Sequence, residues 1–133
     1  MGIKKYQDRI IYQIYPKSFR DSNGDGIGDL RGIIGKLEYL KDLGVNTIWL
    51  NPIFVSPQVD NGYDVSNYYA LDEKMGTLHD FDEFVETAHS LGLDVILDFV
   101  MNHTSDKHPW FKDAIANERS LYRDYYLWAK GKD

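Results

Sequence analysis

The feature that most limits the fold of this chain is a junction that occurs twice, Leu43-Gly44-Val45 and Leu91-Gly92-Leu93. At each one, a segment with apolar residues at helical spacing ends at a glycine, and a short apolar run follows. Glycine readily adopts the left-handed conformation that ends many helices. Two such junctions predict a helix followed by a strand twice over, the rhythm of a parallel sheet with right-handed crossovers.

Three short apolar segments are the expected strands. Residues 10–15 are almost all β-branched or aromatic and stop at Pro16, so we expect a strand that is buried on both faces. Residues 47–50 and 95–100 have the same character, and each follows one of the junction glycines. The order of elements predicts one parallel sheet.

Two segments have the periodicity of helices. The first begins near Leu30, and the second begins after Thr77, which forms a capping-box pattern with Asp80. The expected buried face of the first consists of Leu30, Ile33, Leu37 and Leu40, and that of the second of Phe81, Phe84, Val85, Ala88 and Leu91.

Two architectures use this order of elements, the doubly wound sheet and the eightfold barrel. A nucleotide-binding doubly wound sheet has a glycine-rich turn after its first strand, and this chain has Gly24, Gly26, Gly28 and Gly32 there. Three aspartates are interleaved with these glycines, and their charges would repel a phosphate. The sequence therefore favours the barrel over a nucleotide-binding protein.

The length of the chain limits how much of a barrel it can form. A complete (β/α)8 barrel typically needs about 250 residues, whereas this chain has 133. We expect an α/β fold in which residues 1–101 form the N-terminal part of a TIM barrel, about three of its eight strands. Residues 102–133 lose the strand–helix rhythm, contain a short helix near Pro109, and predict the start of an inserted domain. The last strand would be an open edge, available to the remainder of the barrel or to self-association.

Composition narrows the choice of partners. With 15 Lys and Arg against 21 Asp and Glu, the net charge of −6 disfavours nucleic acid. The apolar runs are strand-length, so no membrane span is expected. The chain has no cysteine and no apolar leader near Met1, which favours a cytoplasmic protein. Aromatic residues make up 14% and suit either a core or the apolar faces of sugar rings.

Oxygen-bearing side chains alternate with other residues in the loop 21–29. Asp21, Asn23 and Asp25 begin it as an EF-hand loop begins, and Asp29 follows. The twelfth position is Gly32 where an EF-hand has glutamate, and a strand precedes the loop. We predict a calcium-binding loop in a different fold, because three aspartates close together would otherwise repel one another. The simpler interpretation is a solvated turn.

Polar residues also follow the second and third expected strands. Asp98 ends an apolar strand, where an unpaired carboxylate is costly, so it is expected either to hold a neighbour or to face a ligand. His103 lies just beyond, at the rim where barrel enzymes build their sites. Asp60 and Tyr63 lie after the second strand, where the spacing alone is that of an ordinary turn.

Taken together, these motifs resemble the alpha-amylase superfamily, and within it the oligo-1,6-glucosidases, dextran glucosidases and trehalose-6-phosphate hydrolases. The resemblance extends over essentially the whole chain. Its motifs are Ile11 to Pro16, Asp21 to Gly32, Leu43 to Val45 with Ile48 to Leu50, Asn61 to Asp64, Asp98 to His103, and Asp124 to Tyr126.

The resemblance implies roles for individual residues. Asp60 matches the residue that binds hydroxyls of the terminal glucose, and Tyr63 the aromatic platform beneath that glucose. Asp98 matches an aspartate that supports the pocket, and His103 a histidine that hydrogen-bonds the same sugar. The implied calcium ligands are Asp21, Asn23, Asp25, Asp29 and the backbone carbonyl of Ile27.

The resemblance also implies the reaction. Such enzymes are retaining exo-acting alpha-glucosidases that hydrolyse alpha-1,6 or alpha-1,4 oligosaccharides, or the disaccharide trehalose 6-phosphate. In the family, the nucleophile, the acid and a third aspartate follow strands four, five and seven, beyond this segment. We therefore expect the 133-residue chain alone to be inactive. The alternative is a non-catalytic module that binds calcium or sugar.

Overall fold

The computed structural model describes residues 5–131, and its centre is a parallel sheet of three strands. The strands are β1 (Ile11–Ile14), β2 (Thr47–Leu50) and β5 (Asp94–Leu97), in the order β1-β2-β5. Each of the two pairings is parallel and in regular register. This confirms the predicted sheet, in which neighbouring strands are joined through helices, as in a β/α barrel.

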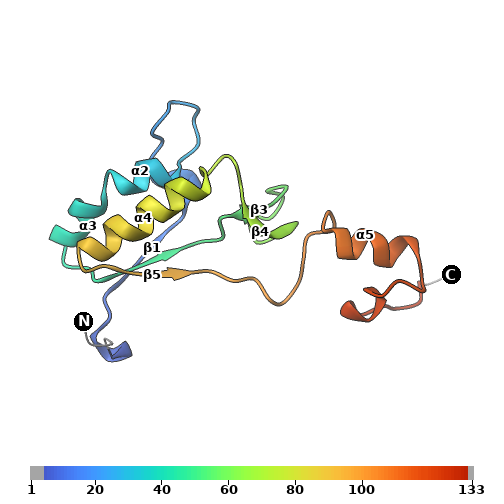
Figure 1. Ribbon diagram of the computed structural model, residues 1–133. Helices are drawn as coiled ribbons and strands as arrows, with labels where there is room; N and C mark the ends of the chain where they lie inside the picture. Colours follow the sequence, from blue (N-terminus) through green and yellow to red (C-terminus); the bar gives the residue numbers. More distant parts are fainter. Residues whose placement is uncertain (1–4, 132–133) are drawn as a thin grey trace.

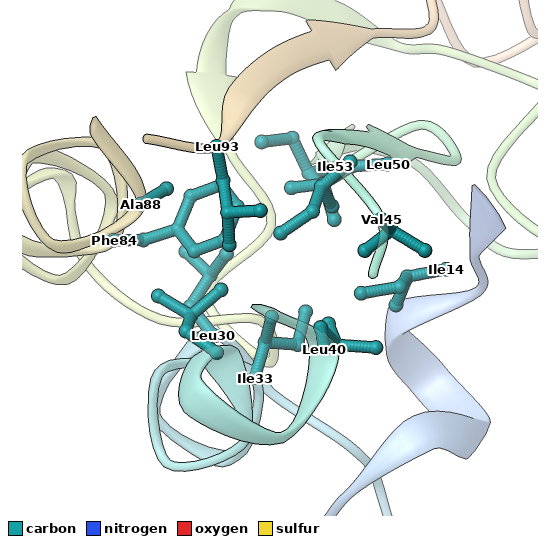
Figure 2. Packing of buried hydrophobic residues seen from close by; sticks show 12 residues of the cluster. Ile14, Leu30, Ile33, Leu40, Val45, Leu50, Ile53, Phe84, Ala88 and Leu93 are labelled. Atoms are coloured by element: carbon teal, nitrogen blue, oxygen red, sulfur yellow. The ribbon is translucent and has the colours of Figure 1, made fainter. Parts of the chain in front are cut away.

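Three helices cover one face of this sheet (Figure 1). They are α2 (Leu30–Ile34), α3 (Leu37–Asp42) and α4 (Leu78–Ser90). Their apolar residues pack against inward-facing residues of the strands and form the buried cluster shown in Figure 2. The predicted face of the first helical segment is confirmed, since Leu30, Ile33, Leu37 and Leu40 are all fully buried.

The helix ends follow the local signals of the sequence. Gly44 and Gly92 have φ values of +95° and +75°, the left-handed conformation predicted at both junctions. Thr77 and Asp80 form the predicted capping box at the start of α4. The first helical segment is divided into α2 and α3 at Gly35 and Lys36, where one continuous helix was expected.

The opposite face of the sheet corrects one prediction. Ile10 and Ile11 are 58% and 48% exposed, and Gln13 is also exposed, so the first strand is not buried on both faces. β5 is also partly open, with Ile96 and Leu97 each 38% exposed. The reason is geometric: within residues 5–131, helices cover one side of the sheet only, and β1 and β5 are both edges.

Several short elements were not predicted. A 3-10 turn, η1 (Tyr6–Asp8), precedes β1, and α1 (Pro16–Phe19) follows it directly. β3 (Phe54–Val55) and β4 (Asn67–Leu71) form an antiparallel pair beyond the end of β2.

The last part of the chain lies beyond the end of β5 (Figure 1). The helix expected near Pro109 is confirmed as α5 (Pro109–Ala116), and the turn η2 (Arg123–Tyr125) follows it. That residues 102–133 begin an inserted domain stays a prediction. No helix within residues 5–131 is long and apolar enough to cross a membrane.

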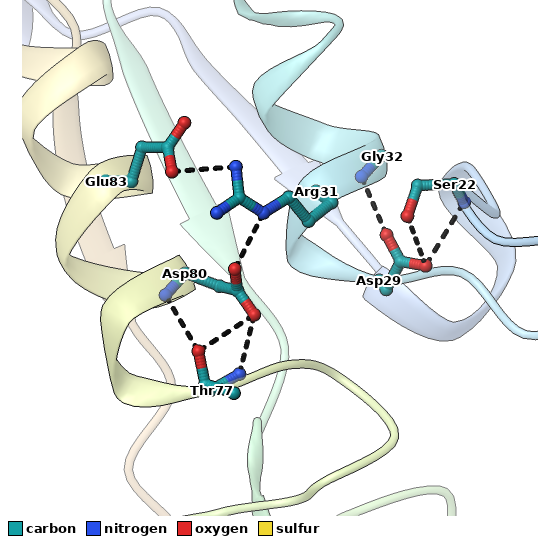
Figure 3. Close-up of polar contacts among 7 residues, drawn as sticks. All are labelled: Ser22, Asp29, Arg31, Gly32, Thr77, Asp80 and Glu83. Carbon is teal, nitrogen blue, oxygen red and sulfur yellow. Dashed lines mark hydrogen bonds and ion pairs between the residues drawn. The ribbon is translucent and has the colours of Figure 1, made fainter.

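Two arginines tie distant elements together. Arg9 donates hydrogen bonds to Thr47 and Asp94 at 2.9 and 2.8 Å, which joins the starts of β2 and β5. Arg31 on α2 reaches Asp80 and Glu83 on α4, at 2.7 Å in each case (Figure 3). Asp80 is also the capping-box residue of α4, so the beginning of that helix is fixed to α2 through one carboxylate.

Candidate functional site

The candidate site lies at the carboxyl ends of β2 and β5. Asp98 follows β5 directly, and its backbone N–H still pairs with the carbonyl of Leu50 at 3.1 Å. Its carboxylate accepts a hydrogen bond of 2.8 Å from the hydroxyl of Tyr63. Burial, followed by the interaction with Asp98, raises the pKa of Tyr63 to about 12. Of the two roles expected for Asp98, holding a neighbour is therefore seen directly.

His103 is attached to the same tyrosine. Its Nε2 lies 2.9 Å from the backbone carbonyl oxygen of Tyr63, and its Nδ1 lies 3.1 Å from the side-chain nitrogen of Asn102. A carbonyl oxygen can only accept, so Nε2 carries the proton and Nδ1 accepts from the amide of Asn102. Both ring nitrogens therefore have protein partners, while the ring itself is exposed.

Asp64 organises the turn that carries Asp60 and Tyr63. Its carboxylate accepts hydrogen bonds from the Ser56 hydroxyl and from the backbone N–H groups of Val59 and Asp60, at 2.9 to 3.1 Å. Burial alone would raise the pKa of Asp64, but these hydrogen bonds outweigh burial and lower it. Asp64 is therefore ionised at neutral pH and holds the turn around a fixed negative charge.

The structure brings three of the four predicted sugar-binding residues into one hydrogen-bonded chain: Tyr63, Asp98 and His103. Asp60 belongs to the same turn, since its carbonyl accepts from the backbone N–H of Tyr63 at 3.0 Å. The side chain of Asp60 is exposed. A solvent-exposed carboxylate next to these three hydrogen-bonded residues is available to sugar hydroxyls.

A wide hollow of about 720 Å³ lies beside this site. Its walls come mainly from aromatic and apolar side chains of β4, the loop after β5 and the last segment of the chain, among them Tyr68, Phe99, Met101, Trp110, Tyr126 and Leu127. Of the four predicted sugar-binding residues, only His103 lines it. Because hydroxyl recognition requires polar partners, we place the candidate site at the Tyr63–Asp98 cluster and not in this hollow.

The acidic loop 21–29 rises above α2 (Figure 1) and is wrapped around Asp21. The carboxylate of Asp21 accepts hydrogen bonds from the backbone N–H groups of Asn23, Gly24 and Gly26. These bonds, with that from Gly26 the largest contribution, lower the pKa of Asp21. The loop therefore already points one ionised carboxylate inward.

The other predicted calcium ligands have partners of their own. Asn23 and Asp25 accept from the backbone two residues further on, and Asp29 accepts from Ser22 and from Gly32 at the start of α2 (Figure 3). Within residues 5–131, no group of three or more His, Cys, Asp or Glu has an arrangement that could hold a metal. A cation here would need the amide oxygen of Asn23 and the carbonyl of Ile27 in addition to carboxylates, which is a donor set typical of calcium.

Two glycines bring the base of this loop against the preceding segment. A Cβ atom on Gly28 would lie 2.0 Å from the carbonyl oxygen of Pro16, and one on Gly32 would lie 2.0 Å from that of Arg20. In addition, the N–H of Gly28 donates to Lys17 at 2.7 Å. These glycines serve close backbone packing and not a phosphate turn.

Parallel strands joined by helices, with polar residues at the carboxyl ends of the strands, define an α/β protein of the kind that binds ligands at that rim, as β/α barrels and doubly wound sheets both do. Comparison with known protein families shows to which family the chain belongs. Residues 13–133 match the alpha-amylase catalytic domain, so the chain belongs to the alpha-amylase family.

Within this family, the chain is similar to oligo-1,6-glucosidases and trehalose-6-phosphate hydrolases. The chain is 55% identical over 126 residues to a probable oligo-1,6-glucosidase 2 of Bacillus subtilis, covering 95% of this chain and 22% of the relative. It is 58% identical over 127 residues to a trehalose-6-phosphate hydrolase of Escherichia coli, covering 96% and 23%. The chain thus spans less than a quarter of the length of these relatives.

Solved structures agree with the fold. The crystal structure of trehalose-6-phosphate hydrolase from Bacillus licheniformis superposes with a TM-score of 0.88 at 55% identity, covering 93% of this chain and 22% of that one. A trehalulose synthase superposes with a TM-score of 0.91 at 49% identity, covering 94% and 23%. The three strands and their helices are therefore part of a TIM barrel.

Proposed function

We propose that this chain is the N-terminal portion of a retaining, exo-acting alpha-glucosidase, and that it supplies one side of the pocket for the terminal glucose. The observation that supports this most directly is the bond from Tyr63 to Asp98, with His103 attached to Tyr63. This cluster lies at the rim where barrel enzymes bind substrate. The relatives named oligo-1,6-glucosidase and trehalose-6-phosphate hydrolase support the substrate class.

In this proposal, each side chain has a binding task. Tyr63 presents its ring to the apolar face of the glucose, and Asp98 fixes that ring through the phenol. The exposed carboxylate of Asp60 accepts hydrogen bonds from glucose hydroxyls. His103 donates from Nε2 to a hydroxyl in place of the Tyr63 carbonyl when sugar enters.

The chemistry itself falls to residues outside this chain. A retaining glycosidase needs one carboxylate that attacks the anomeric carbon and a second that protonates the leaving oxygen. We assign neither role to a carboxylate of residues 5–131, because the family resemblance places both after later strands of the barrel; here Asp98 holds Tyr63 and Asp64 holds the turn. In this proposal, the segment contributes substrate-binding residues, and the catalytic carboxylates come from the rest of the barrel.

We also propose a structural calcium ion at the loop 21–29, bound by Asp21, Asn23, Asp25, Asp29 and the carbonyl of Ile27. The inward carboxylate of Asp21 and its lowered pKa support this ligand set. When bound, calcium would neutralise the carboxylates of a loop that ends directly before α2. The expected cytoplasmic location stays a prediction.

A chimaera tests the proposed function with the residues of this chain. In it, residues 1–133 replace the matching segment of the probable oligo-1,6-glucosidase 2 of Bacillus subtilis, to which the chain is 55% identical over 126 residues. We expect the chimaera to hydrolyse p-nitrophenyl alpha-glucoside, and the 133-residue chain alone to show no hydrolysis. A folded but inactive chimaera would contradict the proposal, as would normal turnover by the chain alone.

The alternative is a binding module without catalysis, which is favoured by a chain that has binding residues but no assigned catalytic carboxylate. Calorimetric titration of the 133-residue chain with isomaltose separates the two. Strong sugar binding by the chain alone would favour the module, because half of a pocket should bind a single glucose unit only weakly.

A further inference from the structure

The hydroxyl of Tyr68 lies between two backbone carbonyl groups of the loop that follows β5. It lies 2.7 Å from the carbonyl oxygen of Val100 and 2.9 Å from that of His103. A phenol has one proton to donate, so the two acceptors share it, and both ends of the segment 100–103 are bound to one atom. Tyr68 belongs to β4, the strand that follows the turn carrying Tyr63.

His103 is therefore held from two sides by the same stretch of chain. Its carbonyl accepts from Tyr68, and its ring nitrogen Nε2 donates to the carbonyl of Tyr63. A third bond lies close by, from the backbone N–H of Ser105 to the carbonyl of Val65 at 2.9 Å. Since Val65 and Ser105 are both buried, this third bond anchors the two stretches but does not itself reach the site.

The ring of Tyr68 is immobilised by other aromatic rings. The ring centroids of Phe99 and Phe54 lie 5.6 and 6.2 Å from that of Tyr68. Tyr68 is therefore packed against β3 and the segment that follows β5. The rings of His108, the N-cap of α5, and of Trp110 in its first turn lie 5.8 and 6.5 Å away. Burial raises the pKa of Tyr68, so its hydroxyl keeps its proton.

We propose that Tyr68 is a positioning residue of the sugar site: its hydroxyl fixes the backbone of Val100 to His103 and thereby sets where the His103 ring meets the glucose. The inference rests on the proposed function, because it assumes that His103 contacts sugar. Tyr68 itself has no sugar contact in this scheme. It acts through the loop, and its aromatic neighbours from β3 and α5 make the loop position depend on both parts of the chain.

The test uses a double-mutant cycle in the chimaera, with Tyr68→Phe, His103→Ala and the double variant. His103→Ala keeps the carbonyl that Tyr68 binds but removes the ring. We expect Tyr68→Phe to lower kcat/KM for p-nitrophenyl alpha-glucoside by about tenfold, the effect of one hydrogen bond. In the His103→Ala background the same change should have little further effect, since no ring remains to be positioned. Tyr39→Phe, which removes a hydroxyl from an exposed tyrosine of α3, is the matched control and should leave kcat/KM unchanged.

The outcomes separate the two proposals. An inactive but folded parent chimaera contradicts the proposed function. If the parent chimaera is active and Tyr68→Phe has the same kcat/KM as the parent, only the positioning role of Tyr68 is contradicted. Additive losses from Tyr68→Phe and His103→Ala also contradict it, because a purely structural effect of Tyr68 would not depend on the ring of His103. A thermal midpoint for Tyr68→Phe within the range of the control, together with non-additive losses, supports the inference.

Discussion

Tyr63 and Asp98 are 35 residues apart in the chain, yet the phenol of the first donates to the carboxylate of the second at 2.8 Å. Through this contact the turn after β3 is bound to the end of β5. Each residue satisfies the other: a carboxylate at a strand end gains a donor, and a half-buried phenol gains an acceptor. The same contact orients the ring that we propose as the sugar platform.

The first prediction concerns the ionisation of Tyr63. Burial, and after it the interaction with Asp98, raises its pKa from the ordinary value of 10.0 to about 12, so the fold favours the neutral phenol and this contribution to stability is complete below pH 10. That contribution is lost as the pH rises from 10 to about 12. NMR titration of the Cζ carbons of labelled tyrosine, with Tyr63→Phe to assign the signal, measures this pKa. In Asp98→Asn the pKa of Tyr63 should move down, because the negative charge is gone; an unchanged value would show that the two side chains are not paired.

The second prediction concerns His108, which begins α5 and is only 5% exposed. Its Nδ1 accepts a hydrogen bond from the backbone N–H of Trp110 at 3.1 Å, which a protonated ring cannot do. Burial lowers the pKa of His108 below its ordinary value of 6.5, so stability is present above pH 6.5 and is lost as the pH falls through the lowered pKa. We expect the thermal midpoint of the chimaera to fall more between pH 7.5 and 5.5 than that of His108→Asn.

Asparagine is a suitable control for His108 because it is a good N-cap and does not titrate. At pH 7.5 His108→Asn should be the less stable of the two proteins, because it keeps the cap but loses the packing of a buried ring, so the comparison is of the change in midpoint with pH. An equal pH dependence in both would rule out His108 as the titrating group.

Local signals account for the parts of the fold that the sequence predicts correctly. Gly44, Gly92 and the capping box of Thr77 act within a few residues, so their effect can be read directly from the chain. The pair of β3 and β4 was missed because β3 has only two residues, and its stability comes from a partner more than ten residues away. The open face of β1 was missed because burial on both faces requires elements outside residues 5–131.

In the site, too, local sequence signals identify some residues, whereas other features depend on tertiary packing. Asp98 and His103 could be identified from their position after an apolar strand, but the contact of Asp98 with Tyr63 depends on tertiary packing. Tyr68 has no signal in the sequence: it is one of ten tyrosines, and only its two carbonyl partners distinguish it.

The third prediction concerns close packing below the acidic loop. In Gly32→Ala the new methyl group would lie 2.0 Å from the carbonyl oxygen of Arg20, where the backbone has to move. We expect a loss of about 3 kcal/mol or more in the free energy of unfolding of the chimaera. Gly35→Ala is the matched control in the same segment, since its nearest neighbour would be 3.6 Å away and its φ is −65°. That variant should be neutral or slightly stabilised, and equal losses in both would contradict the packing argument.

The last prediction concerns calcium. Asp25→Asn keeps the oxygen that accepts from the N–H of Ile27 but removes one negative charge from the proposed ligand set. Because calcium affinity follows the number of charged ligands, we expect calorimetric titration of the chimaera to show binding that this change weakens by about tenfold or more. Asp82→Asn, at an exposed position of α4, removes the same charge away from the loop and should bind calcium like the parent. The lowered pKa of Asp21 keeps that carboxylate ionised below neutral pH, so binding should persist in mild acid. If the parent shows no heat of calcium binding and no rise in its thermal midpoint, the loop is a solvated turn that holds itself together through backbone hydrogen bonds to its own side chains.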